Sequence, residues 1–209
     1  MTSISEQEKA KQPHHIHNNI KFQVIPVSPS STETPLQIVC FFDQTKNQTY
    51  GGGTELVNNH FNGAIKELRA NDCFRGDRFE TLLLTPNEGQ IPAKKLLLVG
   101  LGDPETFSLD TMTTVGRIAV QEAVKLNVET FSFAPSIKDA GVATLPAGDV
   151  SIALAYGLIK GIDSSIKLKE AKLIPQFNLK EIVLLAGAQH VGDSQAGLKK
   201  ALESKGGNV

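Results

Sequence analysis

The sequence is poor in cysteine, carries no excess of either charge and has no long apolar run. Only Cys40 and Cys73 occur among the 209 residues, which rules out a disulfide framework, leaves a single Cys40–Cys73 bond open and fits a reducing compartment. Lysine and arginine number 21, against 22 aspartates and glutamates. A chain so balanced has no global positive field, so we expect no nucleic-acid partner and no attraction to an acidic membrane surface.

No apolar segment approaches the roughly 20 residues that a membrane-spanning helix needs, and the amino-terminal MTSISEQEKAKQ lacks the apolar centre of a signal peptide. We therefore expect a cytoplasmic protein with no membrane partner. Hydrophobic residues make up 40% of the chain, which is enough for one large core with tails.

The first 20 residues are polar and show no periodicity, which predicts a disordered tail. His14, His15 and His17 stand near its end and could take up a stray divalent ion. A metal site needs fixed geometry and usually further ligands, so a solvated tail is favoured. Residues 21–190 are predicted to form the folded domain, and residues 191–209 a C-terminal helix or tail.

Short runs of branched, aromatic and leucine residues, bounded by glycine and proline, predict strands. They occupy residues 21–27, 36–42, 79–86, 94–102, 129–135 and 181–187. The runs at 79–86 and 94–102 suit strands that are buried on both faces.

Helical spacing of apolar residues alternates with these runs. One helix is predicted from an N-cap at Thr54 through Leu68, a second from Ser108 or Asp110 to Asn127, and a third from Asp149 to Gly161. Strands that alternate with helices predict a three-layer α/β/α sandwich with a mixed, mostly parallel sheet.

Several segments of the chain resemble one known family. They are FNGAIKELRANDCFRGDRFETLLLTP, then AKKLLLVGLGDPETFSLDTMTTVGRIAVQEAVKL, and downstream ALAYGLIKGIDSSIKLKEAK. The features that carry the resemblance are Gly63-Ala64-Ile65, Phe74-Arg75-Gly76, the strand from Glu80 to Leu83, and the turn from Leu98 to Gly102. Over roughly residues 22–187 the chain is similar to the N-terminal domain of the leucyl aminopeptidase, or cytosol aminopeptidase, family.

This resemblance implies a macro-domain-like fold, in agreement with the hydrophobic pattern. The family's two-metal site is built in a C-terminal domain that contains an Asn-Thr-Asp-Ala-Glu-Gly-Arg signature, and no segment of this sequence matches it. The resemblance therefore assigns no catalytic residue, no metal ligand and no cofactor to any position here.

Two glycine-rich loops are candidate ligand sites. Gly51, Gly52, Gly53 and Thr54 open the first predicted helix, where backbone amides can approach an anion at the positive end of the helix dipole. Macro domains that bind ADP-ribose use loops of this kind, although a tight strand-to-helix turn also requires glycine. Gly100 and Gly102 follow an apolar strand, but the spacing is not that of a dinucleotide fingerprint, and a plain turn is favoured.

Other polar groups give weaker signals. Arg75, Asp77 and Arg78 could pair with a partner chain or a phosphate, but a solvated turn is the simpler interpretation. His60 and His190 have no sequence neighbour that would make either one a convincing catalytic base.

Three hypotheses remain from the sequence. The chain is a stand-alone, non-catalytic domain that acts through protein contacts, self-association or an unidentified ligand. Alternatively, it is a macro-domain-like protein that binds ADP-ribose or another phosphorylated small molecule at Gly51–Gly53. The third hypothesis is that it is a truncated portion of a metal-dependent leucyl aminopeptidase.

Overall fold

The computed structural model describes residues 13–46, 51–137 and 145–206. Its strands are β1 (His14–His17), β2 (Ile20–Ile25), β3 (Leu36–Phe42), β4 (Thr81–Leu84), β5 (Leu96–Gly102), β6 (Thr130–Ala134) and β7 (Glu181–Leu185). Its α-helices are α2 (Gly52–His60), α3 (Ala64–Ala70), α4 (Leu109–Lys125), α5 (Ala147–Glu170) and α6 (Val191–Gly206), with short 3₁₀ turns at Pro104–Thr106 and Ala188–His190.

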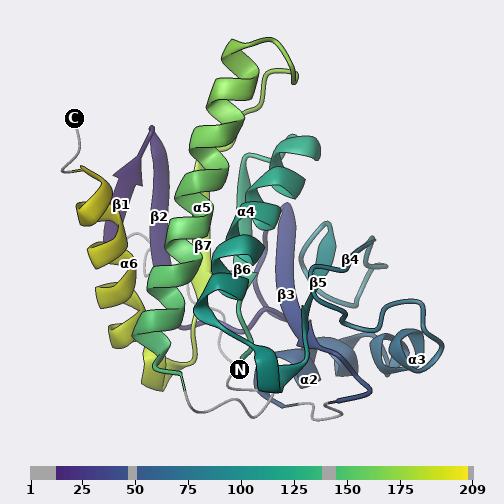
Figure 1. Ribbon diagram of the computed structural model, residues 1–209. Coiled ribbons are helices and arrows are strands. Elements are labelled where there is room, and N and C mark those ends of the chain that lie inside the picture. The colour runs from purple at the N-terminus through teal and green to yellow at the C-terminus, as the bar shows by residue number, and fades with distance from the viewer. Residues whose placement is uncertain (1–12, 47–50, 138–144, 207–209) are drawn as a thin grey trace.

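The strands form one seven-stranded sheet in the order β1-β2-β7-β6-β3-β5-β4 (Figure 1). The five inner strands are parallel to one another. Each edge strand, β1 and β4, runs antiparallel to its neighbour. The prediction of a mixed, mostly parallel sheet in a three-layer sandwich is confirmed.

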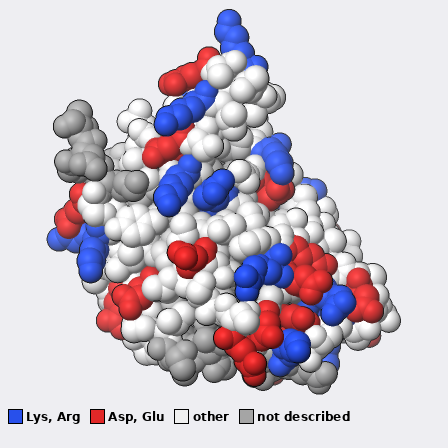
Figure 2. All heavy atoms as spheres, in the orientation of Figure 1, with Lys and Arg blue, Asp and Glu red and all other residues white. Residues whose placement is uncertain are grey.

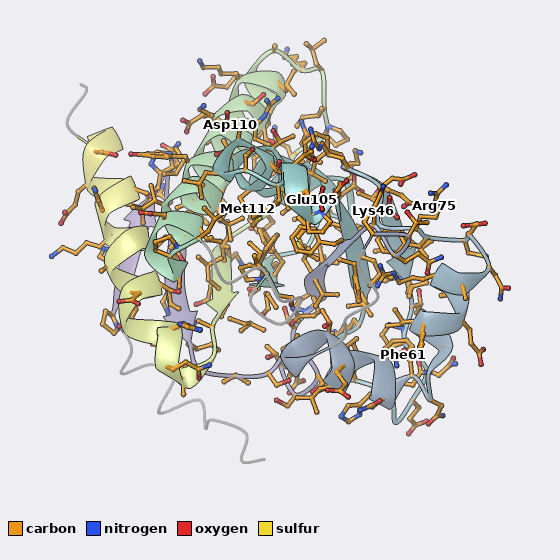
Figure 3. The ribbon with its side chains drawn as sticks, turned by 60° about the horizontal axis from the view of Figure 1, so that its bottom comes forward. Lys46, Phe61, Arg75, Glu105, Asp110 and Met112 are labelled. Carbon is orange, nitrogen blue, oxygen red and sulfur yellow. The ribbon has the colours of Figure 1, made fainter. Side chains whose placement is uncertain are left out.

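Helices cover the two faces of the sheet unequally. α4, α5 and α6 pack on one face over a core that includes Phe22, Phe131 and Met112. α2 and α3 cover part of the other face, where Val57, Phe61 and Ile65 contact sheet residues from β3, β5 and β7. Met112 and Phe61 mark these two side-chain layers in Figure 3. Connections between parallel strands are almost always right-handed, so the direction in which the chain moves across the sheet decides which face the connection covers. From β3 the chain moves toward the β4 edge, and from β5 it moves back toward the β1 edge, so the helices after β3 and those after β5 lie on opposite faces.

The connection from β2 to β3 contains no helix. Residues 26–35 return along the same face as α2, and Ser30, Thr32 and Thr34 in this segment are buried. The carbonyl of Ser28 accepts a hydrogen bond of 2.8 Å from the Thr32 hydroxyl and one of 3.2 Å from the Ser31 hydroxyl. This segment supplies one wall of the cavity described below.

The predicted disordered tail is wrong for residues 14–17. His14–His17 pair antiparallel with β2, and Asn18 and Asn19 form the tight turn between the strands with φ values of 49° and 64°. Asparagine tolerates this left-handed region better than most residues. The His17 Nε2 atom also lies 2.8 Å from Asp163 Oδ1 of α5. Short polar strands at a sheet edge lack the apolar pattern on which the prediction depended.

The single helix predicted from Thr54 to Leu68 is two helices. Asn62 and Gly63 have φ values of 53° and 86° and end the first helix. The N-cap of α2 is Gly51, not Thr54, and Thr54 is buried within the first turn. Two further boundaries differ from the prediction, because α5 begins at Ala147 rather than after Asp149 and continues through Gly161 to Glu170.

The strand at 81–84 is an edge strand with alternating exposure rather than one buried on both faces. Cys40 and Cys73 are free thiols, so the disulfide that the sequence left open is not formed. Cys40 is buried, and this burial raises the pKa of its thiol. None of the helices in the described ranges is long and apolar enough to cross a membrane.

Glycines allow α4 and α5 to approach closely. A Cβ atom on Gly157 of α5 would overlap the carbonyl oxygen of Thr113, and one on Gly116 of α4 would lie 2.6 Å from the carbonyl oxygen of Leu154. Gly161 continues this contact, since its Cβ would lie 2.9 Å from Val120 Cβ. Glycine therefore stands inside α5 because it allows close helix packing, although it is a poor helix former.

We expect Gly157→Ala to lower the free energy of unfolding by about 1–3 kcal/mol, because the added methyl group meets backbone atoms that cannot move aside easily. Gly192→Ala in α6 is the matched control, since a Cβ there has nothing within 4 Å. It should leave stability unchanged or slightly raised. Urea unfolding followed by circular dichroism measures both, and equal stability of the two variants would contradict the packing argument.

Candidate functional site

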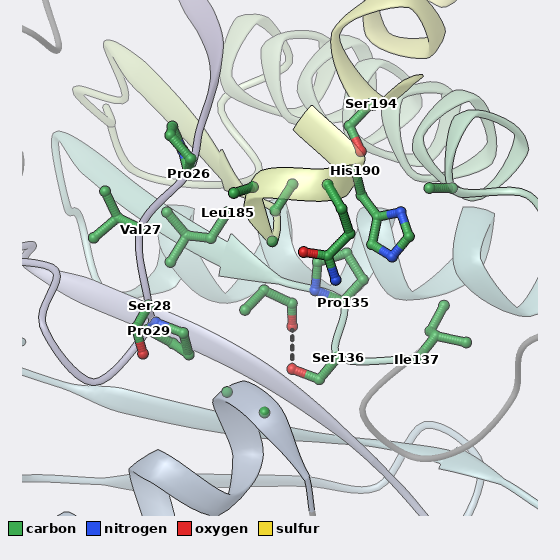
Figure 4. Close-up of a pocket in the computed structure, with 18 of the residues that line it drawn as sticks. Pro26, Val27, Ser28, Pro29, Pro135, Ser136, Ile137, Leu185, His190 and Ser194 are labelled. Atoms are coloured by element: carbon green, nitrogen blue, oxygen red, sulfur yellow. Dashed lines mark hydrogen bonds between the residues drawn. The ribbon is translucent and has the colours of Figure 1, made fainter. Parts of the chain in front are cut away.

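A cavity of about 410 Å³ opens at the carboxyl ends of β2, β6 and β7 (Figure 4). Residues 26–29 follow β2, residues 135–137 follow β6 and residues 186–190 follow β7, and all three segments line it. The first turns of α2, α5 and α6 complete the wall. Segments far apart in the sequence thus meet at one edge of the sheet.

The cavity follows from the topology of the sheet. β3 and β6 are neighbours, but α2 after β3 packs on one face of the sheet and α5 after β6 packs on the other. Chains that leave adjacent strand ends in opposite directions create a crevice between them. Open α/β sheets commonly bind ligands at such a point.

Glycine brings the backbone of α2 to the cavity. Gly52 and Gly53 both line it, and Gly51 is the N-cap without a side chain to bind the helix amides. Gly52 has a φ of 46°, which glycine adopts without strain. The Thr54 hydroxyl donates a 2.9 Å hydrogen bond to the Gly51 carbonyl and holds this turn. The start of a helix carries partial positive charge and favours an anion.

The side chains of the described lining are neutral apart from one titratable group, His190. Pro26, Val27 and Leu185 give apolar surface on one side, and Ile137 adds to it on the other (Figure 4). Hydroxyl, carboxamide and imidazole groups come from the serines, Gln189 and His190. The Ser136 hydroxyl is used within its own turn, because it donates to the Ala134 carbonyl at 3.4 Å.

The structure separates the two predicted glycine loops. Gly52 and Gly53 line the cavity, whereas Gly51, Thr54 and the two β5 glycines, Gly100 and Gly102, are not among its lining residues. A Cβ on Gly100 would overlap the carbonyl oxygen of Asp77. Gly102 has a φ of 76°, and its Cβ would lie 2.9 Å from Arg78 Cβ. These two glycines make room for the segment 76–80, as the plain-turn interpretation holds.

That segment is organised around a carboxylate of its own. Glu80 Oε2 accepts hydrogen bonds from the backbone amides of Arg75, Gly76 and Asp77 at 3.0, 2.8 and 3.1 Å. Three consecutive amides directed at one oxygen form a concave anion site, which Glu80 fills. Arg75 lies on the side of the molecule away from α6 (Figure 3). The segment of Arg75, Asp77 and Arg78, which the sequence suggested as a phosphate site, therefore already binds the Glu80 carboxylate through its backbone.

The two histidines singled out by sequence have different positions. His60 ends α2 and is exposed, so it does not lie on the apolar face of that helix. His190 lines the cavity, on the turn between β7 and α6 (Figure 4). Sequence reasoning missed the contribution of residues 26–29 and 135–137. Their position just after predicted strands was the signal that could have identified them. Tyr50, which directly precedes the three glycines in the sequence, lies outside the described residues.

Charged side chains of both signs are densest at the lower right of the face shown in Figure 2. Acidic and basic residues are intermingled there, so the patch does not have charge of a single sign. Within residues 13–46, 51–137 and 145–206, no group of three or more His, Cys, Asp or Glu side chains could hold a metal ion.

Residues 38–172 match the model of the N-terminal domain of the cytosol aminopeptidase family. The chain belongs to this family. A probable cytosol aminopeptidase from Thermosynechococcus vestitus is 29% identical over 188 residues, which cover 87% of this chain and 35% of that protein. Its counterpart from Alkaliphilus metalliredigens is 30% identical over 116 residues, covering 56% of this chain and 23% of that protein. The chain thus spans about a third of the first relative's length.

Solved structures agree on the fold. A mutant macrodomain from Oceanobacillus iheyensis with ADPR has a TM-score of 0.65 at 15% identity, covering 92% of this chain and 99% of that chain. A mutant of tomato leucine aminopeptidase has a TM-score of 0.62 at 14% identity, covering 90% of this chain and 38% of that chain. The macro-domain-like architecture of this family member is therefore shown. Strands β1, β2 and β7 lie outside the matched residues 38–172 but belong to the same sheet.

We expect Glu80→Ala to lower the free energy of unfolding by about 1–3 kcal/mol, because three amides lose a charged acceptor. Amide hydrogen exchange should become faster at residues 75–77 in particular. A general loss of stability would instead speed exchange throughout the domain. Glu88→Ala, an exposed glutamate in the turn after β4, is the control. Unchanged exchange at residues 75–77 in the Glu80 variant would show that the carboxylate does not hold this segment.

Proposed function

We propose that this domain binds a phosphorylated small molecule of the nucleoside diphosphate class in the cavity at the sheet edge, and that it does not hydrolyse peptides. The observation that carries the proposal is the opening of α2 by Gly52 and Gly53 directly onto the cavity wall. Backbone at the positive end of a helix, without a side chain between it and the ligand, is a common arrangement for phosphate binding.

The remaining lining supports the same ligand class. No acidic side chain belongs to the described lining, so no carboxylate there would repel a phosphate. Apolar surface from Pro26, Val27 and Leu185 suits the flat face of a base or a sugar. The volume of about 410 Å³ falls within the usual range for small-molecule sites, roughly 300–1,000 Å³.

Proteins of the same fold provide further support. Macrodomain structures similar to this chain include one from Oceanobacillus iheyensis with ADPR and one from Trypanosoma brucei in complex with ADP. Identity to them is only 15%, so the ligand is carried over as a proposal about the cavity and not as a property of the fold.

The absence of peptidase activity is proposed from the matched region. The similarity is to the N-terminal domain, whereas the family resemblance implies that the metal ligands belong to the C-terminal one. Protein contact is a second candidate role, favoured by Leu168 and Leu173, which are 37% and 71% exposed at the far end of α5. An exposed apolar pair of this kind suits a contact surface.

Titration calorimetry with ADP-ribose and with ADP tests the ligand proposal. We expect the unchanged protein to bind, and Gly52→Val to weaken binding by at least about tenfold, because its side chain would stand between the ligand and the helix amides. Valine is also strained at the φ of 46° found there.

Gly63→Val is the matched control for that strain. Gly63 has a φ of 86° at the start of α3, a Cβ there has nothing within 4 Å, and the residue lies outside the cavity lining. It should cost similar stability and leave affinity unchanged. The proposal fails if the unchanged protein gives neither heat nor a thermal shift with these ligands, or if both valine variants bind equally well.

The second half of the proposal concerns catalysis. Purified protein is expected to release no p-nitroaniline from leucyl-p-nitroanilide, with or without added Mn²⁺ or Zn²⁺, since a two-metal hydrolase needs convergent carboxylates to hold its ions. A full-length family aminopeptidase in the same assay provides the positive control. Turnover that copurifies with the chain through two different columns would refute this expectation.

A further inference from the structure

Two buried serines face the cavity from the helices opposite α2. Ser151 lies in the first turns of α5 and Ser194 in the first turn of α6, and both line the cavity. They are 5% and 6% exposed, and no hydrogen bond joins either hydroxyl to another described residue. Figure 4 shows the Ser194 side chain next to the start of the His190 side chain. Neither Oγ atom is among the buried atoms of the described residues that lack a partner, so both hydroxyls open to the cavity, where a ligand group can bind them.

The surroundings of these serines favour an uncharged ligand group. Asp149 and Asp193 stand in the same first turns and occupy the favourable position for negative charge at each helix start. Both carboxylates lie on a shallow hollow on the outside of the α5–α6 pair, together with Lys200. The favourable position for an anion at each of these helix starts is thus already occupied by a carboxylate, which leaves the serines to an uncharged group.

A hydroxyl group can donate and accept at once, as the edge of a base or a sugar hydroxyl requires. The start of an α-helix presents backbone N–H groups, and its carbonyls are used within the helix. The cavity thus has a donor end at the start of α2, at Gly52, and a mixed donor and acceptor end at Ser151 and Ser194.

We infer that Ser151 and Ser194 form a specificity subsite for the uncharged polar part of the ligand, so that a nucleotide binds in one direction with its phosphates at α2. This inference rests on the proposed function. It assigns to the serines the role of distinguishing a nucleoside diphosphate from pyrophosphate, which lacks the group that they would bind.

Ser151→Ala and Ser194→Ala test the subsite by calorimetry with ADP and with inorganic pyrophosphate. Each variant should bind ADP about fivefold to tenfold more weakly, the effect of losing one hydrogen bond, and should bind pyrophosphate as the unchanged protein does. Gly52→Val should weaken both ligands. Ser165→Ala is the matched control, because Ser165 is equally buried on α5, at 3% exposure, but lies outside the cavity lining.

Every other outcome has a definite meaning. Equal losses for ADP and pyrophosphate in the serine variants would make the subsite one for anions and overturn the inference. If both serine variants bind ADP as tightly as the protein without substitutions, the inference is also overturned. The same holds if the protein without substitutions binds ADP but not pyrophosphate, because the phosphate end of the cavity would then not bind a ligand by itself. Failure of the unchanged protein to bind ADP at all would instead refute the proposed function.

Discussion

The insertion of β7 between β2 and β6 is the constraint on which the rest of the structure depends. Residues 181–185 pair in parallel with residues 21–25 on one side and with residues 130–133 on the other. In the described sheet, the β1–β2 hairpin joins the other strands only through β7. A two-stranded hairpin alone is marginally stable in water. The carboxyl ends of β2 and β7 also reach the cavity only because this pairing holds them side by side.

Local patterns predicted most of the core. The runs at 36–42, 94–102 and 181–187 are dense in branched or leucine residues because both of their faces are covered, and such runs are readable without knowledge of the fold. Prediction failed where local and tertiary signals disagree. Gly161 resembles a helix end, yet the approach of α4 requires a residue without a side chain at that point. His14–His17 have no apolar pattern, since pairing with β2 defines that strand.

The residues of the candidate site also differ in whether a local sequence pattern or only the tertiary structure reveals them. Gly51–Gly53 could be found from sequence because three glycines before a helix are a local signature, and the structure brings Gly52 and Gly53 to the cavity. Gly100 and Gly102 carry a similar signature for another reason, namely the passage of residues 76–80 beside β5. Ser151 and Ser194 carry no signature at all. They are 43 positions apart in the chain, and both line the cavity because α5 packs beside α6.

The two edges of the sheet have a consequence for how the molecule behaves among its own copies. β1 and β4 are only four residues long, and each runs opposite to its inner neighbour. An open edge with unpaired backbone groups invites another chain to add a strand, and short edges limit that growth. The five parallel strands, rich in aliphatic residues and prone to stack if exposed, are therefore bordered on both sides by strands too short to template a fibril.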